Sequence, residues 1–298
     1  MRPALRAAGL AAVLAAAACT STTPAAHSAP ATGTPPATTA PATAAPPAPS
    51  PKPKPPAPKV SLSRFRAGDG SVVTLAKFKG PVVYRLHSGS SDPGSAALSV
   101  VRAGPSVHGK ERRQLLAAFN GGFLLSAGAG GYQQERHVIS PLRPGLASLV
   151  IDRSGAAHVG VWRAGLPRHG EKVYSVRQNL GPLVWKGHPS NGAADVGLWG
   201  STLGGGAYVA RSALGQNAKG QLIYAASMST IPADLAAALV HARAVTGMEL
   251  DINPEWVQLD VAKAPGRGLR AAIPGQNRPA DQYLFGWTRD FITVLAGG

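Results

Sequence analysis

The sequence predicts a single α+β domain over residues 60–298, dominated by mixed and mostly antiparallel sheet with few helices. Short apolar runs in this region are interrupted by Gly, Pro and Asp, which is typical of chains of short strands. Two interruptions, Asp152–Gly155 and Asn217–Gly220, end in a glycine that can supply the positive φ of a hairpin turn. Only Pro232–Ala244 has clear helical spacing, so helices and strands do not alternate as they do in parallel α/β folds.

The strands are assigned to apolar and β-branched runs between turn residues. One short turn of helix is also expected at His108–Gln114. The expected strands are Ser71–Lys77, Pro81–His87, Ala97–Arg102, Leu115–Phe119, Ala147–Asp152, Ala157–Trp162, Lys172–Arg177, Ala207–Ala210 and Leu222–Ala225.

The predicted helix, Pro232–Ala244, leads into the most polar stretch of the domain. Leu235 and Leu239 lie four positions apart and give the helix one apolar face. Gly247 follows at the position where a glycine commonly ends a helix, and is therefore assigned as its C-cap.

A short strand is expected after Gly247. Because side chains alternate along a strand, Leu250 and Ile252 are expected on one face, with Glu249 and Asp251 on the other. Pro254 lacks an N–H group and restricts the residue before it, so the strand should end there.

Three carboxylates, one amide and one indole fall within Met248–Trp256, in a chain with only 14 acidic residues. A polar cluster at the end of a strand is a common way to build a site on a rigid scaffold. The alternative is a solvated strand face that ends in an ordinary turn. The candidate residues of this stretch are Glu249, Asp251, Asn253, Glu255 and Trp256.

The turn after the Leu115–Phe119 strand is a second candidate. Asn120, Gly121 and Gly122 form a tight turn that can expose backbone amides to a phosphate or a sugar hydroxyl. A plain β-turn is the competing interpretation.

Two further strand ends carry polar side chains. Gln178 and Asn179 each offer a donor and an acceptor, which suits hydroxyl recognition as well as turn capping. Arg211 can present a planar fork to a phosphate, although an unspecific surface position is the alternative.

Residues 1–19 have the pattern of a secretory signal. Arg2 and Arg6 precede an apolar run, Ala7–Ala18, that is too short to span a membrane in the mature protein. Small residues then lead into Cys19, which resembles the lipobox cysteine that is acylated in bacterial lipoproteins. Cleavage by an ordinary signal peptidase after an A-x-A pattern is the alternative. Either pattern predicts a secreted protein of the bacterial envelope, held at the extracellular face of the cytoplasmic membrane by a lipid anchor if Cys19 is acylated.

Residues 20–59 are expected to form a disordered linker rich in Pro, Ala and Thr. The first 59 residues contain no acidic and no aromatic side chain, so they lack the apolar groups needed to form a core. They hold five of the 30 basic residues, which leaves 25 basic against 14 acidic residues, a net charge of +11, in residues 60–298. This excess favours anionic partners.

Several classes of site are excluded. With one cysteine, the chain forms no internal disulfide and no cysteine-based zinc site. The sequence has no G-x-S-x-G, H-E-x-x-H or P-loop motif, and no close histidine spacing suited to a metal. No nucleic-acid-binding motif is present, so nucleic acid is not the expected anion.

The order of these segments resembles the phosphodiester glycosidase family, the group of the lysosomal "uncovering" enzyme that removes N-acetylglucosamine from a phosphodiester. The resemblance covers residues 70–296 and departs from the family after Asp251, where a glycine-rich run is replaced by Ile252–Trp256. The segments that carry it are Asn120–Phe123, Ala147–Asp152, Gln178–Leu183, Arg211–Gly215, Met248–Asp251 and Arg289–Phe291.

The resemblance implies hydrolysis of a sugar C1–O–phosphate bond in a phosphate-bearing glycan. Carboxylates stabilise the oxocarbenium-like centre in such reactions. Asp251 is assigned that role, with Glu255 or Glu249 as a second carboxylate and Arg211 on the phosphate. The hydroxyls and the sugar face are assigned to Asn120, Gly121, Gly122, Gln178, Asn179, Asn253 and Trp256.

Two alternatives to this enzyme remain open. One is a non-catalytic lipoprotein that binds anionic envelope glycan through the same cleft. The other is a nuclease-like phosphodiesterase, which would need a cluster of metal-binding acids. No cofactor is required by the sequence, although carboxylates and amides are also ligands for calcium.

Overall fold

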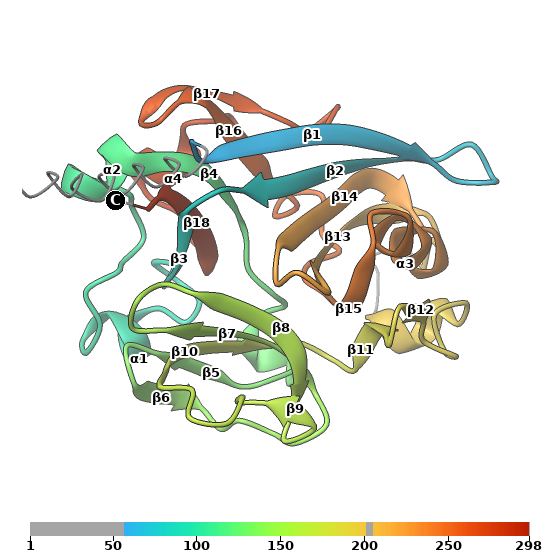
Figure 1. Ribbon diagram of the computed structural model, residues 1–298, viewed down its shortest axis with the longest axis horizontal. Coiled ribbons are helices and arrows are strands. Elements are labelled where there is room, and N and C mark those ends of the chain that lie inside the picture. The colour runs from blue at the N-terminus through green and yellow to red at the C-terminus, as the bar shows by residue number, and fades with distance from the viewer. Residues whose placement is uncertain (1–56, 201–204, 298) are drawn as a thin grey trace, which may run out of the picture. The chain divides into compact units, whose positions relative to one another are not determined.

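The computed structural model describes residues 57–200 and 205–297. The predictions for the signal peptide, for Cys19 and for most of the linker lie outside the described residues. The described residues form one α+β domain built from three sheets (Figure 1). Within the described part, every pair of neighbouring strands is antiparallel except β8 with β9. The predicted fold class is therefore confirmed.

The first sheet has seven strands, and α3 (Pro232–His241) covers one of its faces (Figure 1). Leu235 and Leu239 of this helix are fully buried against the sheet. In spatial order the strands are β1 (Lys59–Arg66), β2 (Val72–Lys79), β14 (Leu222–Thr230), β13 (Val209–Asn217), β15 (Ala244–Glu249), β11 (Pro182–Trp185) and β12 (His188–Pro189).

The second sheet has six strands and the third has five. The six-stranded sheet runs β6 (His137–Ser140), β5 (Tyr132–Gln134), β10 (Val173–Gln178), β7 (Ala147–Asp152), β8 (Ala157–Trp162) and β9 (Gly165–Leu166). The five-stranded sheet runs β17 (Arg267–Ala271), β16 (Leu259–Ala264), β4 (Leu115–Asn120), β18 (Phe291–Ala296) and β3 (Val82–His87).

The remaining helices are single turns or little more. They are α1 (Ser95–Leu98), α2 (Gly109–Gln114) and α4 (Gln282–Phe285), with 3₁₀ turns η1 (Leu125–Ala127) and η2 (Val196–Trp199). No helix in residues 57–200 or 205–297 has the length and apolar character needed to cross a membrane.

The main hydrophobic core joins the three sheets. The ring of Phe119 in β4 stacks on that of Phe78 in β2, with the ring centres 5.7 Å apart. Its centre is 5.0 Å from the centre of the Tyr224 ring in β14. Leu149 of β7 and Ile292 of β18 belong to the same buried cluster. Because the sheets share this core, the ends of β4, β15 and β18 are fixed close together.

The expected strand at Ala97–Arg102 and the expected C-cap at Gly247 are wrong. Ala97 belongs to α1, and the chain continues from it in turns. The helix α3 ends at His241, and Gly247 lies inside β15. A side chain at Gly247 would place Cβ 2.9 Å from Leu239 and 3.2 Å from Val184, so the glycine is needed for close packing of helix on sheet.

Candidate functional site

Charged side chains from distant segments converge where β15, β4 and β18 meet. Asp251 lies two residues after the end of β15, Asn120 ends β4, and Arg289 and Asp290 directly precede β18. These segments are held together by backbone hydrogen bonds, including one from the amide of Gly121 to the carbonyl of Asp290 at 2.9 Å.

Asp251 is the carboxylate at the centre of this cluster. Its Oδ1 accepts hydrogen bonds from the backbone amides of Ile252 (2.8 Å) and Asn253 (2.9 Å). Its Oδ2 accepts one from Nη2 of Arg289 at 2.9 Å. Burial raises the pKa of Asp251 to about 6, although Arg289 and the two amides oppose the rise.

Arg289 links Asp251 to the glycine turn. The same Nη2 donates to the carbonyl of Gly122 at 2.8 Å, and Nε lies 3.8 Å from Oδ2 of Asp92. The guanidinium carbon is 5.3 Å from the centre of the Trp256 ring, within cation–π range. Burial raises the pKa of Asp92, and the nearby Asp290 adds to the rise.

A second buried ion pair lies beneath the turn. Nε of Arg177 donates to Oδ2 of Asp290 at 2.7 Å, and both side chains are 1% exposed. Gly121 and Gly122 pack directly on this pair. A Cβ at Gly121 would lie 2.0 Å from the Asp290 carboxylate, and one at Gly122 would lie 2.9 Å from the guanidinium of Arg177. The two glycines are therefore required by close contact with the ion pair.

We expect Gly121→Ala to lower the free energy of unfolding by about 1–3 kcal/mol, because the added methyl group must displace the Asp290 carboxylate. Gly181→Ala is the matched control, since nothing lies within 4 Å of a Cβ at that glycine. Urea unfolding of the two variants measures the difference. Equal stability of the two would contradict the packing described above.

Arg211 and Glu249 form a third buried ion pair. Nη1 of Arg211 donates to Oε1 of Glu249 at 2.7 Å and to the carbonyl of Trp199 at 3.1 Å. Both side chains of the pair are 0% exposed. Burial raises the pKa of Glu249 to about 8, Arg211 opposes the rise and the charge of Asp251 adds to it. The arginine that contacts Asp251 is thus Arg289, and Arg211 contacts Glu249.

Three of the predicted ligand-binding amides are engaged within the protein. Asn120 donates to Ser212 Oγ at 2.9 Å and accepts from the Tyr224 hydroxyl at 2.7 Å. Asn179 donates to the carbonyls of Glu249 and Leu250, both at 2.9 Å.

Gln178 is used in the same way. Its Oε1 accepts from the amides of Gly131 (3.2 Å) and Arg143 (2.7 Å), and its Nε2 donates to the Arg143 carbonyl and Ser148 Oγ, both at 3.0 Å. These amides are used on backbone and side-chain groups of the protein itself and leave little capacity for a ligand.

In the loop after Asp251, the side chains of Asn253 and Glu255 bond within the loop or to Arg278, and not to the Asp251 carboxylate. Asn253 accepts from the amide of Glu255 at 2.9 Å, as in an Asx turn. The Glu255 carboxylate lies 2.8 Å from Arg278 and is about half exposed. Trp256 packs edge-on against Trp287, with the ring centres 5.5 Å apart. The guanidinium carbon of Arg278 is 5.4 Å from the centre of the Trp256 ring. Glu255 and Trp256 therefore contact Arg278, which the sequence did not single out, and Trp256 also lies against Arg289.

The structure thus brings Asn120, Gly121, Gly122, Asn179, Glu249, Asp251 and Arg211 into one cluster, with Gln178 one position from Asn179. The sequence interpretation missed Asp92 and Arg177, and assigned no role to Arg289 and Asp290. The one sequence feature that could have indicated these residues is the pair Arg289–Asp290 directly before the last strand. Nothing in the local sequence marks Asp92.

Four buried polar atoms in this cluster have no hydrogen-bond partner among the described residues. They are Nε and Nη2 of Arg211, Oε2 of Glu249 and Nε of Arg289. Buried polar groups are nearly always paired in proteins, so unused ones call for an explanation such as a bound ligand. No cluster of three or more His, Cys, Asp or Glu suited to a metal ion occurs in residues 57–200 and 205–297.

The comparisons with known proteins identify only distant likenesses. No protein-family model and no curated protein sequence matches the chain. Among solved structures, the zebrafish N-acetylglucosamine-1-phosphodiester alpha-N-acetylglucosaminidase catalytic domain, auto-inhibited by its pro-peptide, is similar at 12% identity and a TM-score of 0.48. This similarity covers 80% of this chain and 82% of that one.

Two other solved structures are similar over 80% of this chain. A hypothetical protein from Synechocystis is 12% identical with a TM-score of 0.48, and an exported protein from Burkholderia pseudomallei is 14% identical with a TM-score of 0.28. The chain spans 62% and 58% of their lengths, less than two thirds in each case. At these values the comparisons do not bear on activity.

Proposed function

We propose that the protein hydrolyses the C1–O–phosphate bond of a sugar-1-phosphodiester in an anionic envelope glycan, with Asp251 as the catalytic carboxylate. The observation that carries the proposal is a buried carboxylate with a raised pKa, surrounded by ion pairs that retain unused hydrogen-bonding atoms. Perturbed carboxylates of this kind are concentrated at catalytic sites. The signal-like N-terminus and Cys19 support a place at the outer face of the cytoplasmic membrane.

The reaction assigns separate tasks to Asp251 and Arg289. Water adds its oxygen to C1, and the C1–O bond breaks with both electrons on the phosphate oxygen. Asp251 takes the proton from the water, or attacks C1 itself to form an ester. In the second route water then displaces Asp251 from C1, and the proton of the water passes to the freed carboxylate. The phosphate monoester is a good leaving group, so a strong general acid is not needed. Arg289 Nε lies 3.8 Å from Asp92 but makes no hydrogen bond among the described residues, and it is a donor for a phosphate oxygen.

The rate should depend on pH through Asp251. Its pKa of about 6 leaves it mostly ionised at pH 7 and protonated below pH 6, and only the ionised form can act as base or nucleophile. We expect kcat/KM to be level above about pH 7 and to fall about tenfold per pH unit below pH 6. A profile that stays flat from pH 5 to pH 8, measured with a sugar-1-phosphodiester, would contradict the role of Asp251 as base or nucleophile.

A non-catalytic glycan-binding protein is the second candidate. The Asp251 side chain is only 4% exposed, and it lines neither of the two cavities described, of about 590 and 440 Å³. The net charge of +11 in residues 60–298 favours binding of an anionic glycan whether or not the glycan is cleaved. An assay for reducing sugar released from a small sugar-1-phosphodiester separates the two candidates, because the binding protein predicts affinity with no release. Loss of activity with EDTA would instead favour a metal-dependent phosphodiesterase.

A further inference from the structure

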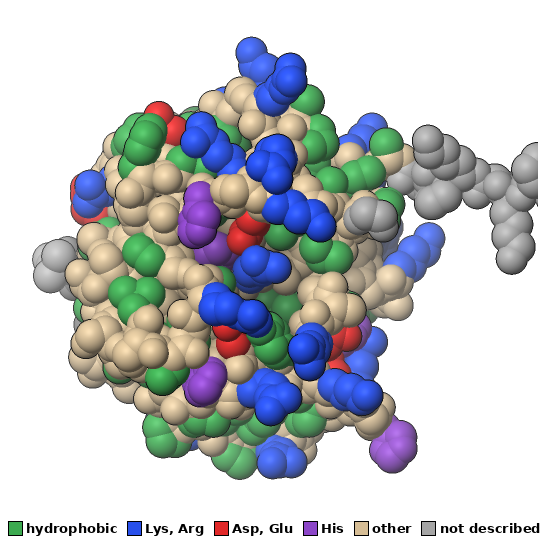
Figure 2. All heavy atoms as spheres, turned by 90° about the vertical axis from the view of Figure 1, so that its left-hand side faces the viewer, with side chains coloured by type: hydrophobic (Ala, Val, Ile, Leu, Met, Phe, Trp, Pro, Cys, Tyr) green, Lys and Arg blue, Asp and Glu red, His purple; other side chains and the backbone are tan. Residues whose placement is uncertain are grey.

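A second polar site lies on the side of the domain that faces the reader in Figure 2. There a cavity of about 590 Å³ is bounded by β3, α2, the turn between β7 and β8, and the start of β10. Figure 2 shows Lys and Arg side chains gathered across this face, with acidic side chains set between them. Asp251, Arg289 and the glycine turn do not line this cavity, so the function proposed above leaves it unexplained.

The cavity is lined by four cations and three carboxylates, and the carboxylates are already occupied. Glu111 accepts from His87 (2.7 Å), Thr293 (2.6 Å) and Arg85 (3.0 Å). Its burial would raise its pKa, but the hydrogen bond to His87 and the nearby charges lower the pKa to about 2, so it remains a carboxylate. It therefore holds Arg85 in place at the cavity wall.

The other two carboxylates are used in the same way. Glu135 accepts from the backbone amides of Arg102 and Ala103, both at 3.1 Å, and lies 3.4 Å from Nε of Arg102. Asp152 accepts from the amide and hydroxyl of Ser154, at 2.8 and 2.6 Å, within its own turn. Each carboxylate is thus satisfied by the protein, and none needs a bound cation.

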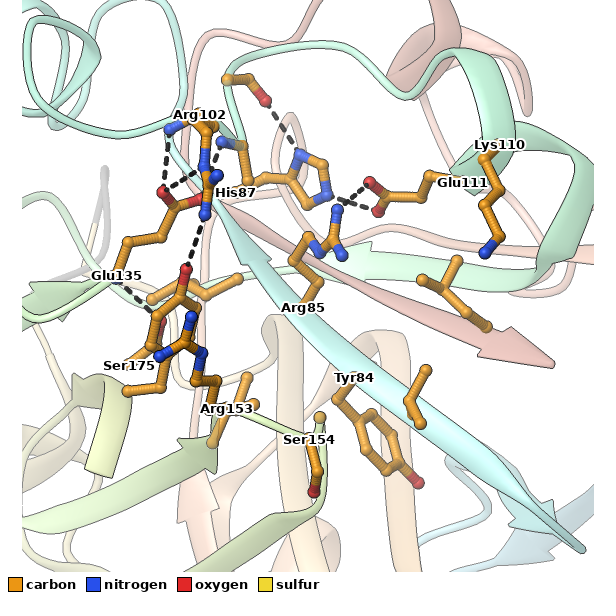
Figure 3. Close-up of a pocket in the computed structure, with 18 of the residues that line it drawn as sticks. Tyr84, Arg85, His87, Arg102, Lys110, Glu111, Glu135, Arg153, Ser154 and Ser175 are labelled. Carbon is orange, nitrogen blue, oxygen red and sulfur yellow. Dashed lines mark hydrogen bonds and ion pairs between the residues drawn. The ribbon is translucent and has the colours of Figure 1, made fainter. Parts of the chain in front are cut away.

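The cations retain free donors. Lys110 and Arg153 are both exposed and form no ion pair within residues 57–200 and 205–297. Arg85 and Arg102 each use only part of the guanidinium on a carboxylate. Figure 3 shows Arg85 and Lys110 on one side of the cavity, and Arg102 and Arg153 on the other. The site therefore offers donors and positive charge to a ligand between them.

The walls of the cavity are fixed by packing. The backbone amide of Tyr84 in β3 donates to the carbonyl of Gly155 at 2.8 Å, which anchors the turn that carries Arg153. Gly155 has a positive φ of 87°, and a Cβ there would lie 2.7 Å from Val83, so glycine is needed for this contact. The His87 side chain is 2% exposed, and both of its ring nitrogens face acceptors, on Gly104 and Glu111.

The size of the cavity indicates which anions it can bind. Small-molecule sites in proteins are typically about 300–1,000 Å³, which is far more than an inorganic phosphate fills. The hydroxyl groups of Tyr174 and Ser175 line the same space. Each accepts one hydrogen bond, from Arg102 and from the amide of Glu135, and keeps its own proton for a ligand hydroxyl. We propose that this cavity is a binding site for an organic phosphate of the sugar-phosphate class, recognised by Lys110, Arg153, Arg85 and Arg102. This site is independent of the reaction proposed at Asp251.

Calorimetric titration of the full chain with glucose 1-phosphate tests the proposal, with glucose and inorganic phosphate as parallel probes. Glucose 1-phosphate should bind more tightly than either, and its affinity should fall as salt is added. Lys110→Gln and Arg153→Gln should each weaken binding about tenfold, as expected for the loss of one charge-assisted contact. Lys186→Gln, in the exposed turn between β11 and β12 on the other side of the domain from α2 and β3 (Figure 1), is the matched control and should bind as the parent does.

The position of the site is tested separately by NMR. Added glucose 1-phosphate should shift the amide signals of Lys110, Glu111 and Ser154 and leave those of Ile252 and Asn253 in place. Undiminished binding in the Lys110→Gln/Arg153→Gln double variant would overturn the proposal. Equal affinity for glucose, or shifts confined to residues 252–253, would overturn it as well. None of these results depends on whether Asp251 catalyses a reaction.

Discussion

Asp251→Asn should lower turnover of a sugar-1-phosphodiester by about 10²–10⁴-fold, the range expected for loss of a positioned acid–base group. The amide keeps the size of the carboxylate and can still accept from the backbone amides of Ile252 and Asn253. It cannot take a proton from water or attack C1. Steady-state kinetics of the variant, with reducing sugar as the readout, measures the loss.

The control for this variant is Asp281→Asn, the same chemical change at an exposed aspartate. It should leave turnover within about twofold of the parent, since surface substitutions away from a site have small effects. Thermal unfolding of Asp251→Asn should confirm that the variant is folded. A folded Asp251→Asn protein with the parent rate would remove Asp251 from the reaction.

Asp290→Asn should cost about 3–5 kcal/mol of stability, because it leaves the buried guanidinium of Arg177 without its counter-charge. Both side chains are 1% exposed, so water cannot replace the lost partner. Gly121 and Gly122 pack on the pair, and we expect the glycine turn to loosen with it. Urea unfolding monitored by tryptophan fluorescence gives the change in free energy.

Glu255→Gln provides the comparison for a pair that is open to solvent. Glu255 and Arg278 lie 2.8 Å apart, but their side chains are 48% and 37% exposed. Exposed pairs contribute about 0–1 kcal/mol, so this variant should unfold close to the parent. If the two variants lost the same stability, burial would not be what makes the Arg177–Asp290 pair important.

The parts of the fold that depend on local signals could be predicted from the sequence. The β7–β8 and β13–β14 hairpins have turn glycines, at Gly155 and Gly220, and both were placed correctly. The run at Ala97–Arg102 is apolar like a strand, but it forms α1 and turns instead, because tertiary packing overrides a short apolar pattern. Gly247 has the sequence position of a helix cap, but it pairs with Val184 of β11 and Gly215 of β13 inside a strand.

The candidate site could be predicted only in outline. The polar stretch at Asp251 and the glycine turn at Gly121 stand out locally in the sequence. The partners of both come from elsewhere, because Arg177 and Asp290 are 113 positions apart and Arg289 reaches Asp251 across 38. Pairings of this kind depend on how the three sheets pack against one another, which no local sequence pattern reveals. The same holds for Trp256, whose ring contacts Arg278, Arg289 and Trp287.

Hydrolysis of a sugar-1-phosphodiester in ¹⁸O-labelled water shows which bond the protein breaks. Attack at C1 breaks the bond between carbon and oxygen, so the released phosphate monoester should contain no ¹⁸O. The sugar should then carry the label at C1, after correction for exchange of its reducing end with the labelled water. Phosphate that contains ¹⁸O would show cleavage between phosphorus and oxygen, and either that result or an absence of turnover by the folded protein would contradict the account.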